Sequence, residues 1–196
     1  MRGQAIALGK HLAARPALTN GEHRICRLVT SPLQRAYHTA QKIAEAHLPL
    51  TIRLDQDPNL MEKDFGNLED TVYGRDQPPM IQVGGEDKAS FQARVKAAFL
   101  PYLKECASDS SQKELIVVTH GLVISAFFKA FVPTERSFAS NTGCFTFDVH
   151  RDLSVIPLAM NEIDHLSSVR RQGGGIGSSA YDQKQASLTS FFTKAQ

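Results

Sequence analysis

A histidine followed by a glycine marks the first place in this sequence where chemistry is expected. The stretch VVTHG (117–121) puts His120 and Gly121 at the point where an apolar run typical of a buried strand gives way to an apolar helical pattern. In an open α/β sheet, ligands bind at the carboxyl ends of the strands, and the free amides at the start of a helix favour an anion, which glycine lets approach the backbone. The pattern therefore indicates an anion site. The alternative is a histidine that only fills a turn, which would have the same sequence.

Two further segments carry side chains suited to phosphate chemistry. SPLQRAYHTA (31–40) puts Arg35 in the first turn of a helix, where its charge is unfavourable to the helix dipole unless it pairs with an anion. NLMEKDFG (59–66) puts the carboxyl group of Glu62 in a loop. Taken singly, Arg35 also reads as a surface arginine and Glu62 as a solvated glutamate.

Alternating strand and helix patterns must position these side chains. The expected strands are 24–31, 51–55, 114–119, 143–150 and 153–158, the last two forming a hairpin around His150-Arg151-Asp152. The expected helices are 33–46 (with Ser31 and Pro32 in cap and first-turn positions), 87–105 and 121–131, and a long loop rich in Gly and Pro is expected at 63–86. This alternation predicts an α/β fold, a three-layer, mostly parallel sheet with helices on both faces.

The first residues predict one more helix. Ala5, Leu8 and Leu12 follow the spacing of a buried helix face, but no Ser, Thr, Asp or Asn precedes them to cap the exposed amides. The sequence is therefore expected to begin inside a helix, with something standing before it in the complete domain.

Composition limits the class of protein. A hydrophobic fraction of 42% and a charged fraction of 21% are those of a soluble globular protein, and a net charge of +2 is too small to indicate a nucleic-acid groove or an anionic membrane surface. Three widely spaced cysteines offer neither a disulfide framework nor metal-ligand spacing, so neither a metal nor another cofactor is expected. With no signal peptide and no apolar run long enough for a bilayer, an intracellular protein, cytoplasmic or nuclear, is expected.

Taken in order, the quoted segments resemble the histidine phosphatase superfamily, in its phosphoglycerate mutase-like branch. The resemblance begins at GQAIALG (3–9), continues through S-P-L-x-R-A-x-x-T-A, L-x-E-x-x-x-G, G-G-E and V-V-x-H-G, and covers about residues 3–166. It implies a phosphoglycerate mutase-like fold and phosphomonoester hydrolysis through a phosphohistidine, with a small phosphorylated substrate of unknown class.

The resemblance also implies roles for the three candidate residues. In the family a histidine takes the phosphoryl group, two arginines and a second histidine hold its oxygens, and a carboxylic acid protonates the leaving group. Arg35 matches a phosphate-binding arginine, His120 the second histidine with Gly121 beside it, and Glu62 the proton donor. The chemistry suits them, since a guanidinium binds phosphate oxygens as a fork and a carboxyl near negative charge can have its pKa raised enough to act as an acid.

One family element has no counterpart in the sequence. Family members begin with a strand that ends in Arg-His-Gly and carries the nucleophile, whereas Arg-His-Gly occurs nowhere in these 196 residues. The remaining histidines do not match that position: His11, His23, His38, His47, His150 and His165. An N-terminally incomplete domain with its first strand missing is therefore expected, and this chain is expected to be inactive.

The other end of the chain has a different composition. Residues 167–184 are rich in Gly and Ser and predict a flexible linker. The domain is therefore expected to span residues 1–166. QASLTSFF (185–192) then resembles the PIP box by which eukaryotic proteins bind the sliding clamp PCNA, with Gln185, Leu188, Phe191 and Phe192 as its binding residues. The alternative is a tail whose aromatic residues fold back on the domain.

Two functions therefore compete at this point. One is a phosphatase acting through phosphohistidine in a longer form of the protein. The other is a non-catalytic phosphate-binding or PCNA-binding protein.

Overall fold

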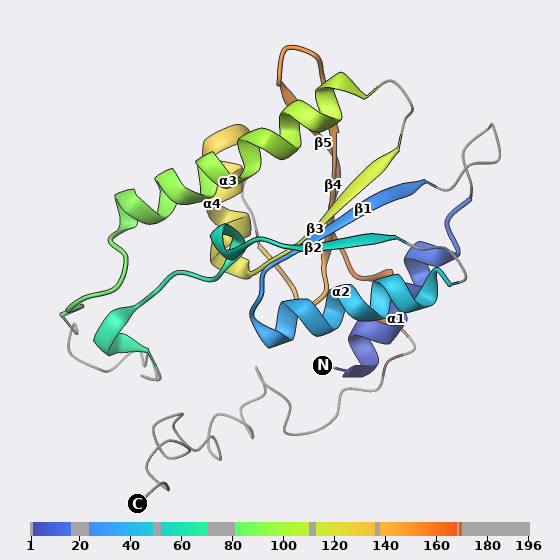
Figure 1. The fold of residues 1–196 in the computed structure, drawn as a ribbon, viewed down its shortest axis with the longest axis horizontal. Coiled ribbons are helices and arrows are strands. Elements are labelled where there is room, and N and C mark those ends of the chain that lie inside the picture. Colours follow the sequence, from blue (N-terminus) through green and yellow to red (C-terminus); the bar gives the residue numbers. More distant parts are fainter. Residues whose placement is uncertain are drawn as a thin grey trace, which may run out of the picture. The chain divides into compact units, whose positions relative to one another are not determined.

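The computed structural model describes residues 2–16, 24–48, 52–69, 81–109, 113–135, 138–167 and 169. Residues 1–62 together with 89–169 form one compact unit, and residues 63–88 belong to a second. The fold described below is that of the first unit, drawn in Figure 1. Within the described residues, no helix is long and apolar enough to cross a membrane.

A parallel three-stranded sheet lies at the centre of the first unit. Its strands are β1 (Ile25–Thr30), β2 (Arg53–Gln56) and β3 (Glu114–Val118), in the order β2-β1-β3. Leu28 and Val29, neighbours on β1 that point to opposite faces, are both fully buried, as a strand covered on both sides requires. All five residues of β3 are only half-buried, because among the described residues β3 pairs with β1 alone.

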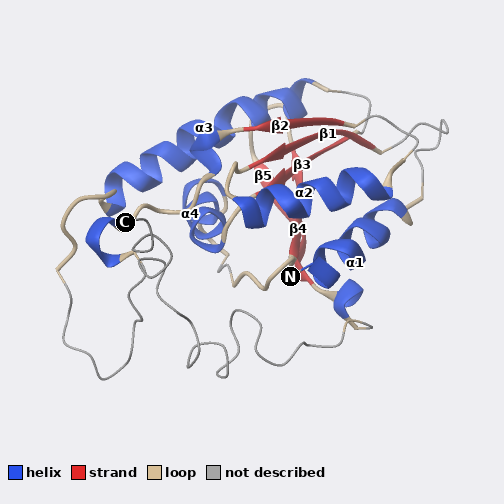
Figure 2. Cartoon of the chain, turned by 60° about the horizontal axis from the view of Figure 1, so that its bottom comes forward, coloured by secondary structure: helices blue, strands red, loops and turns tan. Residues whose placement is uncertain are grey.

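Two pairs of helices cover the two faces of this sheet (Figures 1 and 2). They are α1 (Arg2–Ala13) with α2 (Gln34–Ala46), and α3 (Lys88–Ser108) with α4 (Gly121–Phe131). Leu28 joins Leu8 and Ile43 in the cluster under the first pair, while Val29 belongs to the larger cluster under the second. Gly9 lets α1 pack closely on α2, since a Cβ there would lie 2.5 Å from the carbonyl oxygen of Lys42.

An antiparallel hairpin of β4 (Cys144–Val149) and β5 (Val155–Glu162) forms a separate two-stranded sheet. Its turn is closed where the His150 N–H donates to the Ser154 carbonyl and the Leu153 N–H donates to the His150 carbonyl. The expected turn at 150–152 is thus confirmed, and the second strand runs four residues further than expected.

The strands β3 and β4 lie between the same two apolar clusters, although they share no hydrogen-bonded ladder. On β3, Leu115 and Val117 pack against the larger cluster and Ile116 and Val118 against the smaller one. On β4, the larger cluster is contacted by Phe145, Phe147 and Val149 and the smaller one by Cys144. Within the described residues, the edge of β3 that is turned away from β1 has no strand partner.

Most expected elements are confirmed, with α4 matching 121–131 residue for residue. The expected role of Ser31 as helix cap was wrong: the N-cap of α2 is Leu33, without a side-chain cap bond. The expected loop 63–86 includes a short 3-10 helix, η2 (Gly66–Leu68), which belongs to the second unit. Most of the expected linker and all of the PIP-box-like segment lie outside the described residues.

Candidate functional site

The carboxyl ends of the three parallel strands meet at one edge of the sheet, and backbone bonds join the loops that leave them. The N–H of Ser31, directly after β1, donates to the carbonyl of Val118 at the end of β3 (3.0 Å). The N–H of Asp57, directly after β2, donates to the carbonyl of Thr30 at the end of β1 (2.9 Å). The expected site residues leave the sheet at this edge.

His120 stands between β3 and α4 as the N-cap of the helix, and only 5% of its surface is exposed. The Nε–H of Arg35 donates to its Nδ1 at 3.0 Å, and its Nε2 lies 2.8 Å from the Oγ of Ser31. Because a guanidinium has only donors, Nδ1 must be the accepting nitrogen. The neutral ring therefore carries its proton on Nε2 and donates it to Ser31.

The surroundings of His120 keep the ring uncharged. Burial, followed by the positive charge of Arg35, lowers the pKa of His120 from 6.5 to about 4. Both causes disfavour the imidazolium, since a charged ring would lose solvation and face a cation. At neutral pH the ring accepts a hydrogen bond from Arg35 and does not repel it.

Arg35 lies in the first turn of α2 and is exposed. Its Nε is the atom bound to His120, so the two Nη groups are the part of the guanidinium that an anion can engage as a fork. A cation at this end of a helix is disfavoured by the helix dipole. An anion at the Nη groups would remove that disadvantage.

Gly121 is the first residue of α4, as the sequence predicted. A Cβ added to it would meet nothing within 4 Å. The backbone at the start of this helix is therefore open to a ligand, and any side chain at this position would occupy that opening.

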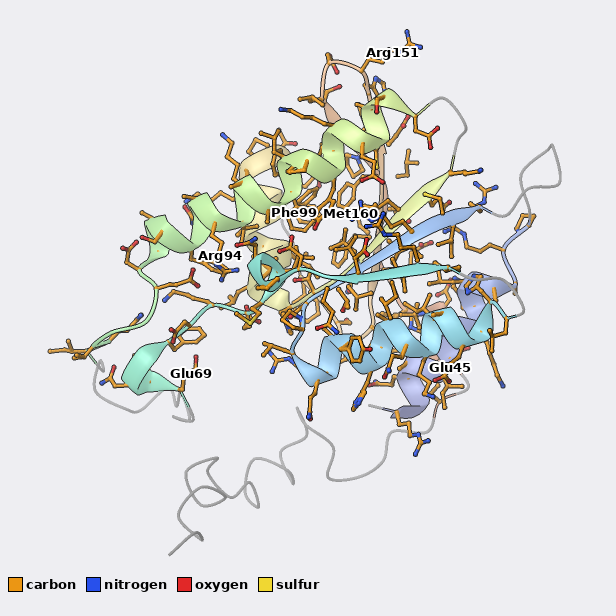
Figure 3. All side chains as sticks on the ribbon, viewed as in Figure 1. Glu45, Glu69, Arg94, Phe99, Arg151 and Met160 are labelled. Carbon is orange, nitrogen blue, oxygen red and sulfur yellow. The ribbon has the colours of Figure 1, made fainter. Side chains whose placement is uncertain are left out.

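Glu62 lies in the loop that follows β2, and its carbonyl is held by α3. The Nη1 of Arg94 donates to the carbonyls of Asn59 (2.6 Å) and Met61 (3.2 Å), and its Nη2 donates to the carbonyl of Glu62 (3.4 Å). In Figure 3 Arg94 projects from α3 beside this loop. One arginine thus fixes the backbone on which the candidate proton donor stands.

The same loop is tied to the strand that carries His120. It contains a 3-10 turn, η1 (Pro58–Leu60), whose Leu60 carbonyl accepts a hydrogen bond of 2.7 Å from the hydroxyl of Thr119. Asp57 caps the turn by accepting from the N–H of Asn59 (2.9 Å), and its other oxygen accepts from the hydroxyl of Tyr102 on α3 (2.6 Å). The backbone at Glu62 is therefore positioned relative to both β3 and α3.

Not all candidate residues of the sequence come together in the same way. Arg35 and His120 are in direct contact, and Glu62 belongs to a loop bonded to Thr119, the neighbour of His120. The PIP-box-like residues fall outside the described part of the chain: Gln185, Leu188, Phe191 and Phe192.

Sequence reasoning missed three residues that position this site: Ser31, Arg94 and Thr119. Ser31 and Thr119 directly follow strands, the same signal that pointed to His120, and could have been found from it. Arg94 lies in the middle of a helix, where no local pattern distinguishes it from a solvated arginine. Among the described residues, no group of three or more His, Cys, Asp or Glu side chains could hold a metal ion.

An arginine–histidine pair lies at the carboxyl edge of a parallel sheet in an α/β protein, beside an open helix start, which is where proteins of this class commonly bind ligands. The chain matches the model of the histidine phosphatase superfamily (branch 1) over residues 2–151, and it belongs to that family. It is 30% identical over 180 residues to a probable phosphatase of Schizosaccharomyces pombe, covering 84% of this chain and 62% of that protein. This chain thus spans less than two thirds of that relative's length.

Solved structures share the fold at lower identity. A phosphoglycerate mutase from Bacillus anthracis has a TM-score of 0.63 at 17% identity, over 84% of this chain and 81% of the other. A mycobacterial glucosyl-3-phosphoglycerate phosphatase, solved with inorganic phosphate, has a TM-score of 0.61 at 20% identity, over 85% of this chain and 87% of the other. The α/β fold with its parallel sheet is therefore phosphoglycerate mutase-like.

Proposed function

We propose that this domain serves phosphomonoester hydrolysis through a phosphohistidine, in a form of the protein that supplies the nucleophilic histidine. The observation that carries the proposal is the bond of 3.0 Å between Arg35 and His120 at the carboxyl edge of the sheet. Family membership and the phosphatases among the similar proteins support it. The substrate is a small phosphorylated molecule.

Each residue has a role that follows from its chemistry. The Nη groups of Arg35 bind two phosphoryl oxygens, and the amides at Gly121 and the start of α4 receive the remaining negative charge. His120 holds the guanidinium of Arg35 beside these oxygens through the bond at Nδ1, and the Glu62 carboxyl protonates the leaving oxygen. Bound phosphate raises the pKa of a nearby carboxyl, which suits it to act as an acid.

None of the other histidines among the described residues is placed to act as the nucleophile. These histidines lie elsewhere: His11 against His165 with ring centroids 5.7 Å apart, His47 bonded to the Ile43 carbonyl at the end of α2, and His150 in the hairpin turn. His38 stands exposed on α2. Without a histidine in line with the phosphoryl group, the covalent step cannot occur, so residues 1–196 should bind phosphate without turning over an ester.

The edge of β3 supports this proposal. Among the described residues β3 and β4 lie between the same two clusters and do not pair, which is the arrangement expected on either side of an additional strand. Backbone groups at such an edge need partners, and a parallel strand there would satisfy them. Its carboxyl end would lie beside His120, where the family carries Arg-His-Gly.

The test compares the chain with a version that has such a strand fused before Met1. Residues 1–196 should hydrolyse p-nitrophenyl phosphate at the background rate and form no phosphohistidine. The fused version should hydrolyse it, and Arg35→Ala or His120→Ala in that version should abolish the gain, while Thr39→Ala on the same helix should leave it. Phosphohistidine formed by residues 1–196 alone would contradict the proposal.

A second candidate function rests on the tail sequence. We propose that residues 185–192 bind PCNA, because Gln185, Leu188 and the aromatic pair at 191 and 192 have the spacing of a PIP box. Binding is mostly apolar, since an extended segment buries one leucine and two aromatic rings in a pocket. The non-catalytic alternative for the whole protein, a phosphate-binding domain that docks through its tail, would combine both sites.

A peptide of residues 181–196 tests the tail by itself. It should bind PCNA saturably, the double variant Phe191→Ala/Phe192→Ala should lose binding, and Ser190→Ala should retain it. Binding should weaken only modestly with salt, because the flanking lysines, Lys184 and Lys194, make screened rim contacts. A peptide that shows no saturable binding at high micromolar concentration would contradict this second proposal.

A further inference from the structure

Ser31 is a fully buried polar residue to which the proposed mechanism gives no role. None of its surface is exposed, and it is the first residue after β1. Its Oγ lies 2.8 Å from the Nε2 of His120 and accepts a second hydrogen bond from the N–H of Leu33 at 3.2 Å. The hydroxyl therefore connects the segment that leads into α2 to the ring of His120, the N-cap of α4.

These bonds form one chain from backbone to guanidinium. The Leu33 N–H and the His120 Nε2–H both donate to the Ser31 oxygen, while the His120 Nδ1 accepts from the Nε–H of Arg35. Arg35 fixes the donor–acceptor direction of every side-chain bond in this chain of hydrogen bonds, since a guanidinium can only donate. If Nε2 had no acceptor, nothing would hold the ring in the form whose Nδ1 is free to accept.

We propose that Ser31 is a positioning residue: its hydroxyl holds His120 in the Nε2–H form, and His120 in turn holds Arg35 with both Nη groups directed to the phosphoryl site. This inference rests on the proposed phosphate-binding function. It goes beyond that function by assigning the residue that orients the His120 ring and, through it, the Arg35 guanidinium. Ser31 acts through His120 and does not touch the substrate.

Loss of the hydroxyl has a specific consequence. In Ser31→Ala the Nε2–H would be buried without an acceptor, which costs free energy in a site where water has little access. The ring can avoid this by moving its proton to Nδ1. That change sets an N–H against the Nε–H of Arg35, which removes the acceptor of Arg35 and releases the guanidinium from its orientation.

If Ser31 had only a structural role, the Ser31→Ala variant should behave differently. If its value lay only in the bond to Leu33, removing the hydroxyl would loosen the start of α2 but leave the ring nitrogens of His120 as they are. The protonated nitrogen of His120 is therefore the readout that separates the two roles. Thr39→Ala is the matched control, because its hydroxyl donates to the Arg35 carbonyl at 2.9 Å on the same helix.

The experiment uses the full 196-residue chain with ¹⁵N-labelled histidine at pH 7.5. In the wild-type protein, Nδ1 of His120 should show the chemical shift of an unprotonated nitrogen and Nε2 that of an N–H. Ser31→Ala should move the proton at least partly to Nδ1, and affinity for inorganic phosphate should fall about tenfold, the scale of one well-placed hydrogen bond. Thr39→Ala should change neither.

Two outcomes would overturn the proposal. One is an unchanged Nε2–H signal in Ser31→Ala, and the other is an unchanged phosphate affinity in a variant whose ring has changed. If Ser31→Ala does not fold, Ser31→Cys keeps the volume with a weaker acceptor and should show the same changes at smaller size. If the wild-type chain binds no phosphate, the proposed function fails, and the ¹⁵N spectra still decide whether Ser31 sets the state of His120.

Discussion

Acidification should destabilise this protein through His120, by about 3 kcal/mol. Burial and the charge of Arg35 lower the pKa of His120 from 6.5 to about 4. A pKa difference of about 2.5 between the unfolded and folded chains corresponds to about 3 kcal/mol of folding free energy. Because the folded value is the lower one, this stability is fully present above pH 6.5 and is lost as the pH falls toward 4.

The measurement is a pair of urea unfolding curves, at pH 7.5 and pH 4, for the wild type and for His120→Gln. The glutamine cannot be protonated, so the wild type should lose about 3 kcal/mol more than the variant between the two pH values. An NMR titration should place the inflection of His120 near pH 4, and Arg35→Gln should raise it by removing the second cause. Arg53→Gln, an exposed cation on β2, is the control and should not move it.

An inflection of His120 near 6.5 in the folded wild type would refute this reasoning. It would mean that water reaches the ring or that Arg35 does not face it. Equal losses of stability in the wild type and in His120→Gln would refute it as well, because other groups would then account for the pH dependence.

Three further predictions concern the surroundings of the site. Arg94→Met should destabilise the fold by about 2 kcal/mol in urea unfolding, because three carbonyls of the Glu62 loop lose a charged donor, and an unchanged midpoint would contradict the assigned anchoring. Burial, with a smaller effect of Glu162, raises the pKa of the Cys144 thiol to about 11. Its reaction with iodoacetamide should therefore be slow at pH 8 and accelerate up to about pH 11, and rapid labelling of Cys144 at pH 8 would contradict this. A hydrophobic dye should bind the chain at the half-buried edge of β3 and bind less once a strand is fused there, whereas equal dye binding by both would show that the edge is already covered.

The elements were predictable because their signals are local. The helix α4 begins at Gly121 and is apolar almost throughout, so its limits could be read from the sequence alone. The strand β1 shows as a short apolar run bounded by a polar turn, and the hairpin by alternation around residues 150–152. The apolar run of β3 predicts a buried strand, whereas its five residues are half-buried. Their burial depends on what pairs with the second edge of the strand, which a local pattern does not show.

The candidate residues of the site could be picked out from the sequence, whereas the residues that hold them in place could not. His120 and Arg35 follow strand ends in recognisable motifs, but the partner of each supporting residue lies far away in sequence. Thr119 reaches Leu60 across 59 residues and Ser31 reaches His120 across 89. The Ser31-Pro32 pair looked like a helix start because a serine oxygen is a good cap, and the fold uses that same oxygen for the histidine ring.

The pairing of β3 links the open edge of the sheet to the chemistry of the site. His120 follows a strand that, within the described residues, is paired on one side, with β1, and is also held by the bond from the Ser31 N–H to the Val118 carbonyl. A parallel strand added on the other side would lie about 4.8 Å away, so the residue after its carboxyl end would stand beside His120. A nucleophile there and the Nη groups of Arg35 would reach the same phosphoryl group from two directions. Under the proposed function, Arg35 and His120 bind phosphate in this chain and turnover requires the added strand, so phosphate binding and ester hydrolysis should be separable in the fused and unfused proteins.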